Sequence, residues 1–182
     1  GISYLPFVSG ILAANAKKIK KIKKRINFKP YIFVPDTADN LIKNYYDEKP
    51  DIAVFSISMW NEQLSLEVAK KIKEKWDPLI IFGGPSCPHN PTEYFKKHKF
   101  IDIAVRAEGE DAFNEILIKH LNGQSFEDIP NVSFRNKNDE CQINLNGIKF
   151  NKNLDVYPSP YLSGEYDYLF EGKKEKSGSC GS

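Results

Sequence analysis

The stretches IIFGGPS (residues 80–86) and AVRAEGEDAF (residues 104–113) decide the fold class of this chain. Each begins with an apolar run typical of a buried β-strand, turns at a glycine and continues into a helical pattern. The same alternation of strand and helix extends outward from them, from about residue 30 to residue 123. Because parallel strands need crossover connections, the sequence predicts an α/β fold with a doubly wound parallel sheet.

Four parallel strands are predicted for this sheet, near residues 31–34, 51–57, 79–83 and 102–106. Thr37 or Asp39 is expected to cap the helix after the first of them, and Gly123 to end the helix after the last. A further helix is expected from about Pro6 to Arg25. Since a crossover helix follows a strand, the first strand of the sheet is apparently missing from the sequence.

The pattern changes after Ser125. Val132–Arg135 and Cys141–Ile143 are expected to pair as a small antiparallel hairpin. The following VYPSPYLSGEYDYLF is rich in proline and aromatic residues, which indicates an extended linker. We therefore expect an α/β domain at residues 1–124, a hairpin extension at 125–153, and a linker with a polar tail at 154–182.

Composition narrows the class of protein. The 182 residues are 41% hydrophobic and 27% charged, within the ordinary globular range. No stretch approaches the ~18 consecutive apolar residues of a membrane-spanning helix. Cys87, Cys141 and Cys180 lie far apart, which signals neither a zinc site nor a disulfide framework. A reduced, cytoplasmic protein is expected.

The net charge is only +2, but residues 17–25, KKIKKIKKR, are strongly basic. Ile19, Ile22 and Ile26 recur at helical spacing, so the segment can form a helix with an apolar side and a cationic side. Contact with RNA, phosphate or a membrane surface is one interpretation. A solvated helix face is the other, and it is favoured because no aromatic residues alternate with the lysines to stack on bases.

The strand ends carry the candidate site. In an open parallel sheet, ligands bind outside the carboxyl ends of the strands, where the turns at residues 56–61, 83–90 and 107–110 should gather. Gly83 and Gly84 remove side chains where a ligand or a neighbouring backbone must come close, and Gly109 permits a tight turn. The glycines could equally serve the turns alone.

Several side chains at this edge allow two interpretations. Glu108 and Glu110 could act as an acid–base pair, although a carboxylate at a helix start is also explained by the helix dipole. Trp60, directly after a strand, could line the crevice or pack at the start of a helix. His89, near Cys87, could join a metal site, but two candidate ligands without a third are weak evidence.

Four segments, in order, resemble a known family: PDIAVFSISMWNEQLSLEVAKKIKE, IIFGGPSCPHNPTEYF, IDIAVRAEGEDAFNEIL and LDVYPSPYLSG. Together they are similar to the N-terminal cobalamin-binding domain of cobalamin-dependent radical SAM enzymes, over about residues 2–164. The resemblance implies a flavodoxin-like or Rossmann-like sheet that holds the corrin over its carboxyl edge. It also implies that the linker leads into a radical SAM domain, which is absent here together with its iron–sulfur cluster and S-adenosylmethionine.

Carried over to this chain, the resemblance implies a cofactor-binding edge without catalytic residues or metal ligands. Its members are Ser56, Ser58, Met59, Trp60, Asn61, Gly83, Gly84, Pro85, Ser86, Glu108, Gly109 and Glu110. The family's Arg-Gly-Glu-Gly-Glu turn has alanine at its second position here, which should be tolerated if Ala107 keeps a negative φ. Replacing Gly84 by leucine is expected to abolish cofactor retention with little loss of fold.

Two functions follow. The first is a cobalamin-binding module of a larger radical SAM enzyme, a methyltransferase or a related catalyst. The alternative is a non-catalytic flavodoxin-like interaction domain that binds nucleic acid or a protein through its basic helix. In the first case the partners are cobalamin and the missing radical SAM domain, nucleic acid is not expected as a partner, and no membrane span is involved.

Overall fold

The computed structural model describes residues 7–29, 36–45, 48–88, 90–144 and 151–168. The chain divides into two compact units, one formed by residues 1–31 with 152–182 and the other by residues 32–151. The second unit contains the sheet. Within the described ranges, no helix is long and apolar enough to cross a membrane.

The sheet has five strands in the order β1-β2-β3-β4-β5. β1 (Ile52–Ser56), β2 (Leu79–Gly83) and β3 (Ile103–Val105) are parallel, which confirms three of the predicted strands. The strand predicted near residues 31–34 lies outside the described residues. β4 (Val132–Arg135) and β5 (Cys141–Ile143) form the predicted hairpin, and β4 pairs antiparallel with β3. The hairpin therefore extends the same sheet, which is mixed: parallel from β1 to β3 and antiparallel from β3 to β5.

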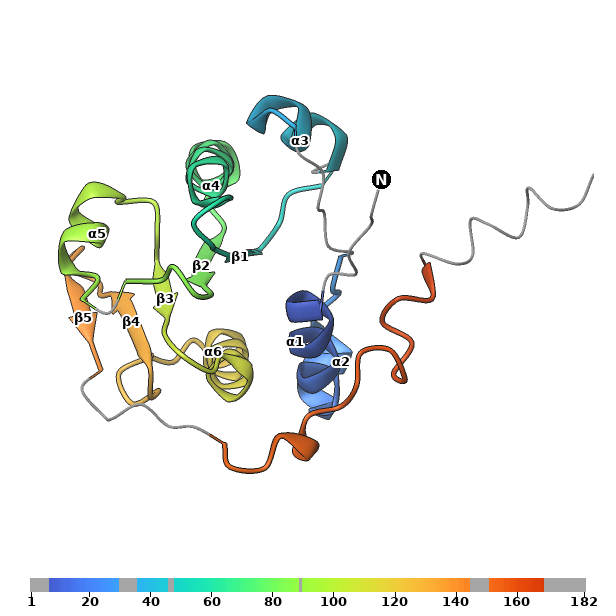
Figure 1. The fold of residues 1–182 in the computed structure, drawn as a ribbon. Helices are drawn as coiled ribbons and strands as arrows, with labels where there is room; N and C mark the ends of the chain where they lie inside the picture. The colour runs from blue at the N-terminus through green and yellow to red at the C-terminus, as the bar shows by residue number, and fades with distance from the viewer. Residues whose placement is uncertain (1–6, 30–35, 46–47, 89, 145–150, 169–182) are drawn as a thin grey trace, which may run out of the picture. The chain divides into compact units, whose positions relative to one another are not determined.

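Helices cover both faces of the sheet (Figure 1). α4 (Glu62–Trp76) lies on one face beside α3 (Ala38–Tyr45), and α6 (Glu110–Asn122) lies on the other. α5 (Thr92–Lys97) connects β2 to β3. This arrangement confirms the doubly wound α/β class. Two expected helix signals are also present, because Thr37 Oγ1 accepts from Asn40 N at 3.3 Å and Gly123 ends α6 with φ 65°.

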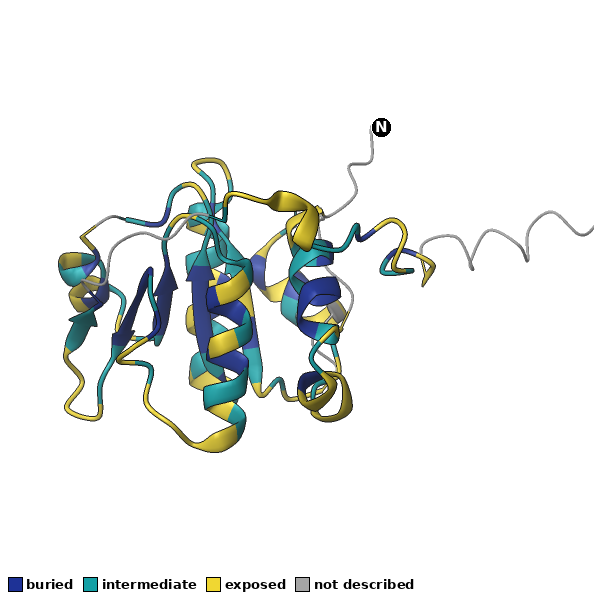
Figure 2. Cartoon of the chain, turned by 90° about the horizontal axis from the view of Figure 1, so that it is seen from below, coloured by how far each residue is buried: buried dark blue, intermediate teal, exposed yellow. Residues whose placement is uncertain are grey.

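The largest core lies between the sheet and α4. Ile80 and Phe82 of β2 are fully buried there together with Ile72 of α4 and Phe95 of α5. Because side chains alternate across a strand, Ile81 of β2 faces the opposite side, which α6 covers. Figure 2 shows buried residues concentrated in the strands and exposed ones in turns and on outward helix faces. The turns that follow β2 and β3 are therefore attached to strands that are mostly buried.

In the first unit, the expected continuous helix is wrong. α1 (Phe7–Lys17) and α2 (Lys20–Arg25) are separate, because Ile19 has extended backbone angles of φ −84° and ψ 110°. The amphipathic character of α2 is confirmed, since Ile22 is fully buried among exposed lysines.

The segment expected to be an extended linker is instead folded onto α1. It contains a short 3₁₀ helix, η1 (Leu154–Val156), and a series of turns up to Asp167. Lys17 Nζ lies 2.7 Å from a carboxylate oxygen of Glu165. A Cβ on Gly10 would lie 2.8 Å from the Tyr166 ring and 2.9 Å from Pro160, so the absence of a side chain lets both pack on the helix.

Candidate functional site

Three turns lie at one edge of the sheet. The parallel register places Ser56 beside Gly83 and Phe82 beside Ala104, so β1, β2 and β3 end at a common edge. β2 and β3 are largely buried, but every one of the twelve residues predicted for the site is partly or fully exposed. These are Ser56, Ser58, Met59, Trp60, Asn61, Gly83, Gly84, Pro85, Ser86, Glu108, Gly109 and Glu110. The fold therefore brings the predicted residues together on an accessible surface.

The turn after β1 displays two large apolar side chains. Met59 is 85% exposed and Trp60 is 78% exposed. The turn is held by Asn61, whose Oδ1 accepts from Ser58 N at 2.7 Å and whose Nδ2 donates to Ser56 O at 3.0 Å. Of the two interpretations of Trp60, the structure favours the one in which its side chain lines the open edge.

The turn after β2 packs directly against the turn after β1. Gly84 has φ +101°, and a Cβ there would lie 2.6 Å from Ile57 O and 2.9 Å from Ile57 N. Ile57 N also donates to Gly83 O at 2.7 Å, and Ser86 N donates to Ile57 O at 3.2 Å. Gly84 is therefore required by a neighbouring backbone, and the expectation that Gly84→Leu would spare the fold is wrong.

The other two glycines of the site are less constrained. A Cβ on Gly83 would lie 3.7 Å from Val105 O, and one on Gly109 would lie 3.7 Å from a methyl group of Val105. Both are ordinary contact distances, so the fold itself leaves room for a methyl group at each position. Gly109 serves as the N-terminal cap residue of α6, with φ −99°.

The turn after β3 is strained at Ala107. Its φ is +58°, in the left-handed region, so the condition under which alanine was expected to be tolerated here, a negative φ, is not met. A residue with a Cβ is disfavoured in this region by ~1–2 kcal/mol. Glycine, which the family pattern has at this position, would avoid that cost. Ala107 lies between Val105, the last residue of β3, and Gly109, the N-terminal cap residue of α6. The strained residue is therefore confined to the turn between the strand and the helix.

The same turn is tied to distant parts of the second unit. Arg106 N donates to Asn131 O at 2.9 Å, and Arg106 Nη2 donates to Asn144 O at 3.3 Å. Glu108 Oε2 accepts from Asn151 N at 2.7 Å. The three asparagines were not singled out from the sequence. Asn131, directly before β4, has φ 64°, which asparagine tolerates better than most residues, but this angle is known only from the structure.

Two groups behind the turns, the partly buried Tyr94 and the buried Cys87, support them. Tyr94 of α5 donates its hydroxyl to Glu62 Oε1 at 3.0 Å, and burial together with this hydrogen bond raises the pKa of Tyr94. Burial also raises the pKa of the Cys87 thiol to about 12, so this thiol stays neutral. Both Glu62 and Tyr94 lie just beyond predicted turns, and sequence patterns gave no sign that they would meet.

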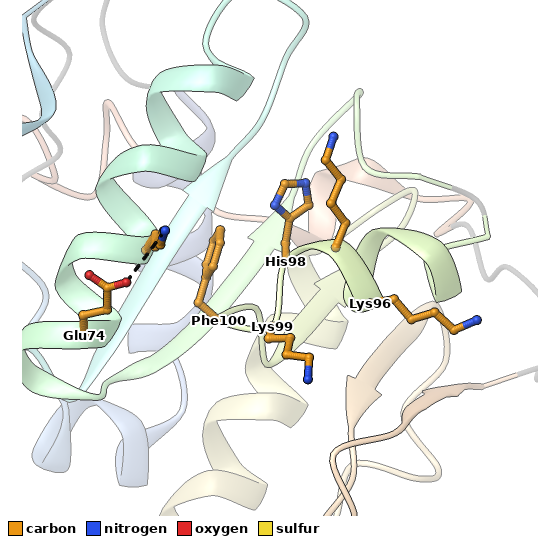
Figure 3. Close-up of a pocket in the computed structure, with 7 residues that line it drawn as sticks. Glu74, Lys96, His98, Lys99 and Phe100 are labelled. Carbon is orange, nitrogen blue, oxygen red and sulfur yellow. Dashed lines mark ion pairs between the residues drawn. The ribbon is translucent and has the colours of Figure 1, made fainter.

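A pocket of about 520 Å³ lies elsewhere, between α4 and the segment from α5 to β3. Lysines line it, and His98 packs between Tyr94 and Phe100 with ring centroids 4.7 and 5.6 Å away. Figure 3 shows Lys96 and Lys99 extending away from His98 and Phe100. Lys96 also pairs with Glu93 at 2.8 Å. The lysines therefore do not converge on one point, and the pocket is a poor anion site.

The described residues contain no group of three or more His, Cys, Asp or Glu side chains placed to hold a metal ion. His89, the one histidine considered as a ligand from the sequence, lies outside the described residues. The edge is therefore best described as an open apolar and hydroxyl-bearing surface between three anchored turns.

The sequence profile of the B12 binding domain matches residues 14–117. The chain is 31% identical over 170 residues to the cobalamin-dependent radical SAM methyltransferase TokK of Streptomyces tokunonensis. It is 30% identical over 168 residues to the 2-(S-pantetheinyl)-carbapenam-3-carboxylate methyltransferase of Streptantibioticus cattleyicolor. These matches cover 90% and 91% of this chain but only 24% of each relative, so the chain spans about a quarter of their length.

Solved structures show the same fold. The cobalamin-dependent S-adenosylmethionine radical enzyme OxsB, with aqua-cobalamin and S-adenosylmethionine bound, matches 93% of this chain with a TM-score of 0.66 and 20% identity. The match covers 23% of that enzyme. The radical S-adenosylmethionine methyltransferase TsrM from Kitasatospora setae matches 76% of this chain and 27% of its own, with a TM-score of 0.53 and 14% identity.

Proposed function

This chain belongs to the family of B12-binding domains, and we propose that it is the cobalamin-binding part of a larger cobalamin-dependent radical SAM methyltransferase. The observation that carries the proposal is the profile match to residues 14–117, which contain the three parallel strands β1, β2 and β3, the helices α3 and α4, and most of α6. The two methyltransferase relatives, each about four times as long as the matched region, support the larger enzyme. We assign the iron–sulfur cluster and S-adenosylmethionine to a radical SAM domain outside this sequence.

The carboxyl edge of the sheet fits a corrin. Cobalamin is a broad macrocycle with an apolar face and a rim of amide groups, so its site needs an open apolar surface with hydrogen-bonding groups around it. Met59 and Trp60 offer such a surface, with their side chains 85% and 78% exposed. The adjacent turn has two glycines and Ser86, and it therefore leaves space beside them.

We propose that the twelve residues of the edge hold the cofactor in different ways. Met59 and Trp60 contact it through their side chains, and Ser58 and Ser86 face it as hydroxyl donors. Gly83, Gly84, Pro85 and Gly109 contribute backbone surface, as do Ser56 and Glu110. The side chains of Asn61 and Glu108 already bind backbone groups of the protein, so these two shape the turns.

When bound, cobalamin supplies methyl or electron transfer chemistry. The residues of this chain bind and orient it and exclude water from the face that they cover. The larger enzyme is proposed to work in the cytoplasm, where cysteines such as Cys87 and Cys141 stay reduced. The alternative of an interaction domain acting through its basic helix is not supported.

The proposal is tested by incubating the chain with hydroxocobalamin, desalting it and recording the corrin absorbance. We expect about one corrin retained per chain, with Trp60→Ala losing most of it and Trp76→Phe, at the far end of α4, losing little. A folded chain that retains no corrin would contradict the proposal. Retention on RNA that falls with rising salt would instead favour the interaction domain.

A further inference from the structure

Met59 and Trp60 are two large apolar side chains that are mostly exposed on one turn. Large apolar side chains that are mostly exposed on a turn gain little from packing, so nothing in the side chains themselves keeps the turn in one conformation. A surface that must be ordered when a ligand arrives also costs affinity. The structure should therefore contain a device that fixes this turn before binding.

Asn61 provides such a device. Its Oδ1 accepts from Ser58 N at 2.7 Å and its Nδ2 donates to Ser56 O at 3.0 Å. The backbone of Asn61 adds a third bond, from its N to Ser58 O at 3.0 Å. One residue thus closes the loop around Met59 and Trp60 and holds the two ends of the turn together.

The bonds of Asn61 also tie the turn to the start of α4. Asn61 has helical backbone angles, and Ser58 O accepts from both Asn61 N and Glu62 N at 3.0 Å. The bond from Ser58 N to Asn61 Oδ1 is therefore the reciprocal bond of a capping box, in which a side chain three residues along returns to the backbone N at the start of the helix. The clamp on the turn is thus also part of the N-terminal cap of α4.

The other side of the turn is anchored as well. Ile57, directly before Ser58, is fully buried, and its N and O are held by Gly83 O and Ser86 N at 2.7 and 3.2 Å. The two exposed side chains therefore lie between a buried anchor and the Asn61 clamp. Of these two supports, Ile57 belongs to the core and Asn61 does not. Asn61 can therefore be substituted without removing a core side chain.

We infer that Asn61 is a positioning residue, which holds Met59 and Trp60 in the conformation that receives the corrin without contacting the corrin through its own amide. This inference rests on the proposed function for the identity of the ligand. The clamp itself is a property of the free protein, so it can be measured before any cofactor is added.

The first experiment reports on the free chain. Trp60 and Trp76 are its two tryptophans, so Trp76→Phe leaves Trp60 as the single fluorophore. In this background we expect Asn61→Ala to increase the fast nanosecond component of the Trp60 anisotropy decay. Asn61→Asp, which keeps an acceptor for Ser58 and loses the donor to Ser56, should lie between. Asn122→Ala, at the end of α6, is the matched control and should change nothing.

The second experiment measures the Kd for hydroxocobalamin in a double-mutant cycle. Asn61→Ala is expected to raise the Kd by about tenfold, which corresponds to about 1.4 kcal/mol. If Asn61 acts through Met59 and Trp60, the same change made in a chain that carries both Met59→Ala and Trp60→Ala should have less than about a twofold effect. A tenfold effect that persists without both side chains would mean direct contact with the cofactor and would overturn the inference.

The two experiments separate the possible failures. An unchanged Trp60 anisotropy in Asn61→Ala would overturn the clamp, whatever the cofactor does. A chain that retains no cobalamin would contradict the proposed function, while the anisotropy would still decide whether Asn61 orders the turn. Circular dichroism checks that each variant is folded, and Asn61→Asp keeps the test valid if the alanine variant does not fold.

Discussion

The turns after β1 and β3 lie at the same edge of the sheet but are held in opposite ways. The first is closed by a side chain of its own, Asn61, over a span of five residues. The second contains a strained Ala107 and is held by bonds from Arg106 and Glu108 to residues 25 to 43 positions away. One edge therefore combines a locally determined turn with one that depends on the hairpin region.

The difference shows how separate parts of a binding edge can be made rigid. A local clamp needs only the adjacent backbone, so the turn after β1 can form as soon as β1 and α4 are in place. The turn after β3 needs Asn144 and Asn151, which follow the hairpin. We therefore expect loss of the hairpin region to disturb Arg106–Glu110 and to leave Met59 and Trp60 in place.

The largest expected effect is that of Gly84→Leu, at the contact between the turns after β1 and β2. The Cβ of the new residue would lie 2.6 Å from Ile57 O, and its backbone would have to keep the φ of +101° that Gly84 has. Left-handed strain of ~1–2 kcal/mol and overpacking of ~1–3 kcal/mol together predict a loss of about 2–5 kcal/mol in the free energy of unfolding. Urea denaturation measures it.

Gly83→Ala is the matched control for this substitution. Its Cβ would lie 3.7 Å from the nearest atom, so we expect a change below about 1 kcal/mol. If Gly84→Leu unfolded with the same midpoint as Gly83→Ala, Gly84 would not be the point at which the two turns meet.

Glu108→Ala tests the long-range support of the turn after β3. Removing the acceptor for Asn151 N, 2.7 Å away, is expected to lower the free energy of unfolding by about 1–2 kcal/mol, because a hydrogen bond to a carboxylate is lost. Glu108→Gln should recover most of this, since its amide oxygen can still accept. Hydrogen exchange should show the amide of Asn151 losing protection in the alanine variant alone.

Equal loss in the glutamine and alanine variants would show that the charge of Glu108, and not its bond to Asn151, is what matters. Asn61→Ala provides the internal comparison between the two turns. It should leave the exchange of the Asn151 amide unchanged, because Asn61 binds only the turn after β1.

Cys87, just after the Gly84 turn, predicts a pH dependence. Burial raises the pKa of its thiol to about 12 in the folded chain, above its ordinary value. The folded state therefore disfavours the thiolate, so stability is fully present below the unfolded pKa and is lost as pH rises toward 12. From pH 8 to 10.5 we expect the free energy of unfolding to fall by about 2–2.5 kcal/mol on this account.

The fall should be smaller in Cys87→Ala, and the difference between the two pH profiles isolates the thiol. Iodoacetamide supplies an independent measurement, because a buried neutral thiol reacts slowly. We expect Cys87 to be modified more slowly than the partly exposed Cys141 at pH 8, and at a similar rate in urea. Rapid modification of Cys87 in the folded chain would show that its turn opens.

The sequence was sufficient where local patterns decide the structure. The apolar runs placed β1, β2 and β3, the hairpin at Val132–Arg135 and Cys141–Ile143 was predicted at its observed residues, and Gly123 ends α6 as expected. The division into residues 1–124, 125–153 and 154–182 stays a prediction. The twelve site residues do meet at one edge, because parallel strands bring their carboxyl ends together.

Prediction failed where distant contacts decide. The packing of Tyr166 on Gly10 and the ion pair of Lys17 with Glu165 join segments about 150 residues apart, so the linker pattern alone suggested an extended chain. The hydrogen bond between Glu108 and Asn151 joins residues 43 positions apart, so the sequence around neither residue could predict it. The sign of φ at Ala107 was left as a condition in the sequence analysis, and its positive value occurs between two neighbours, Arg106 and Glu108, that bind distant residues.

The smallest expected effect is also the most direct test of that strain. Ala107 has φ +58°, where glycine loses the steric penalty of ~1–2 kcal/mol, but glycine also gains freedom in the unfolded chain. Ala107→Gly should therefore raise the free energy of unfolding by about 0.5–1 kcal/mol. Ala112→Gly, inside α6 with ordinary helical geometry, is the matched control and should lower it by about the same amount or more. Opposite signs for the same substitution would show that the turn after β3 is held under strain by its long-range bonds, whereas destabilisation at both positions would mean that Ala107 is relaxed.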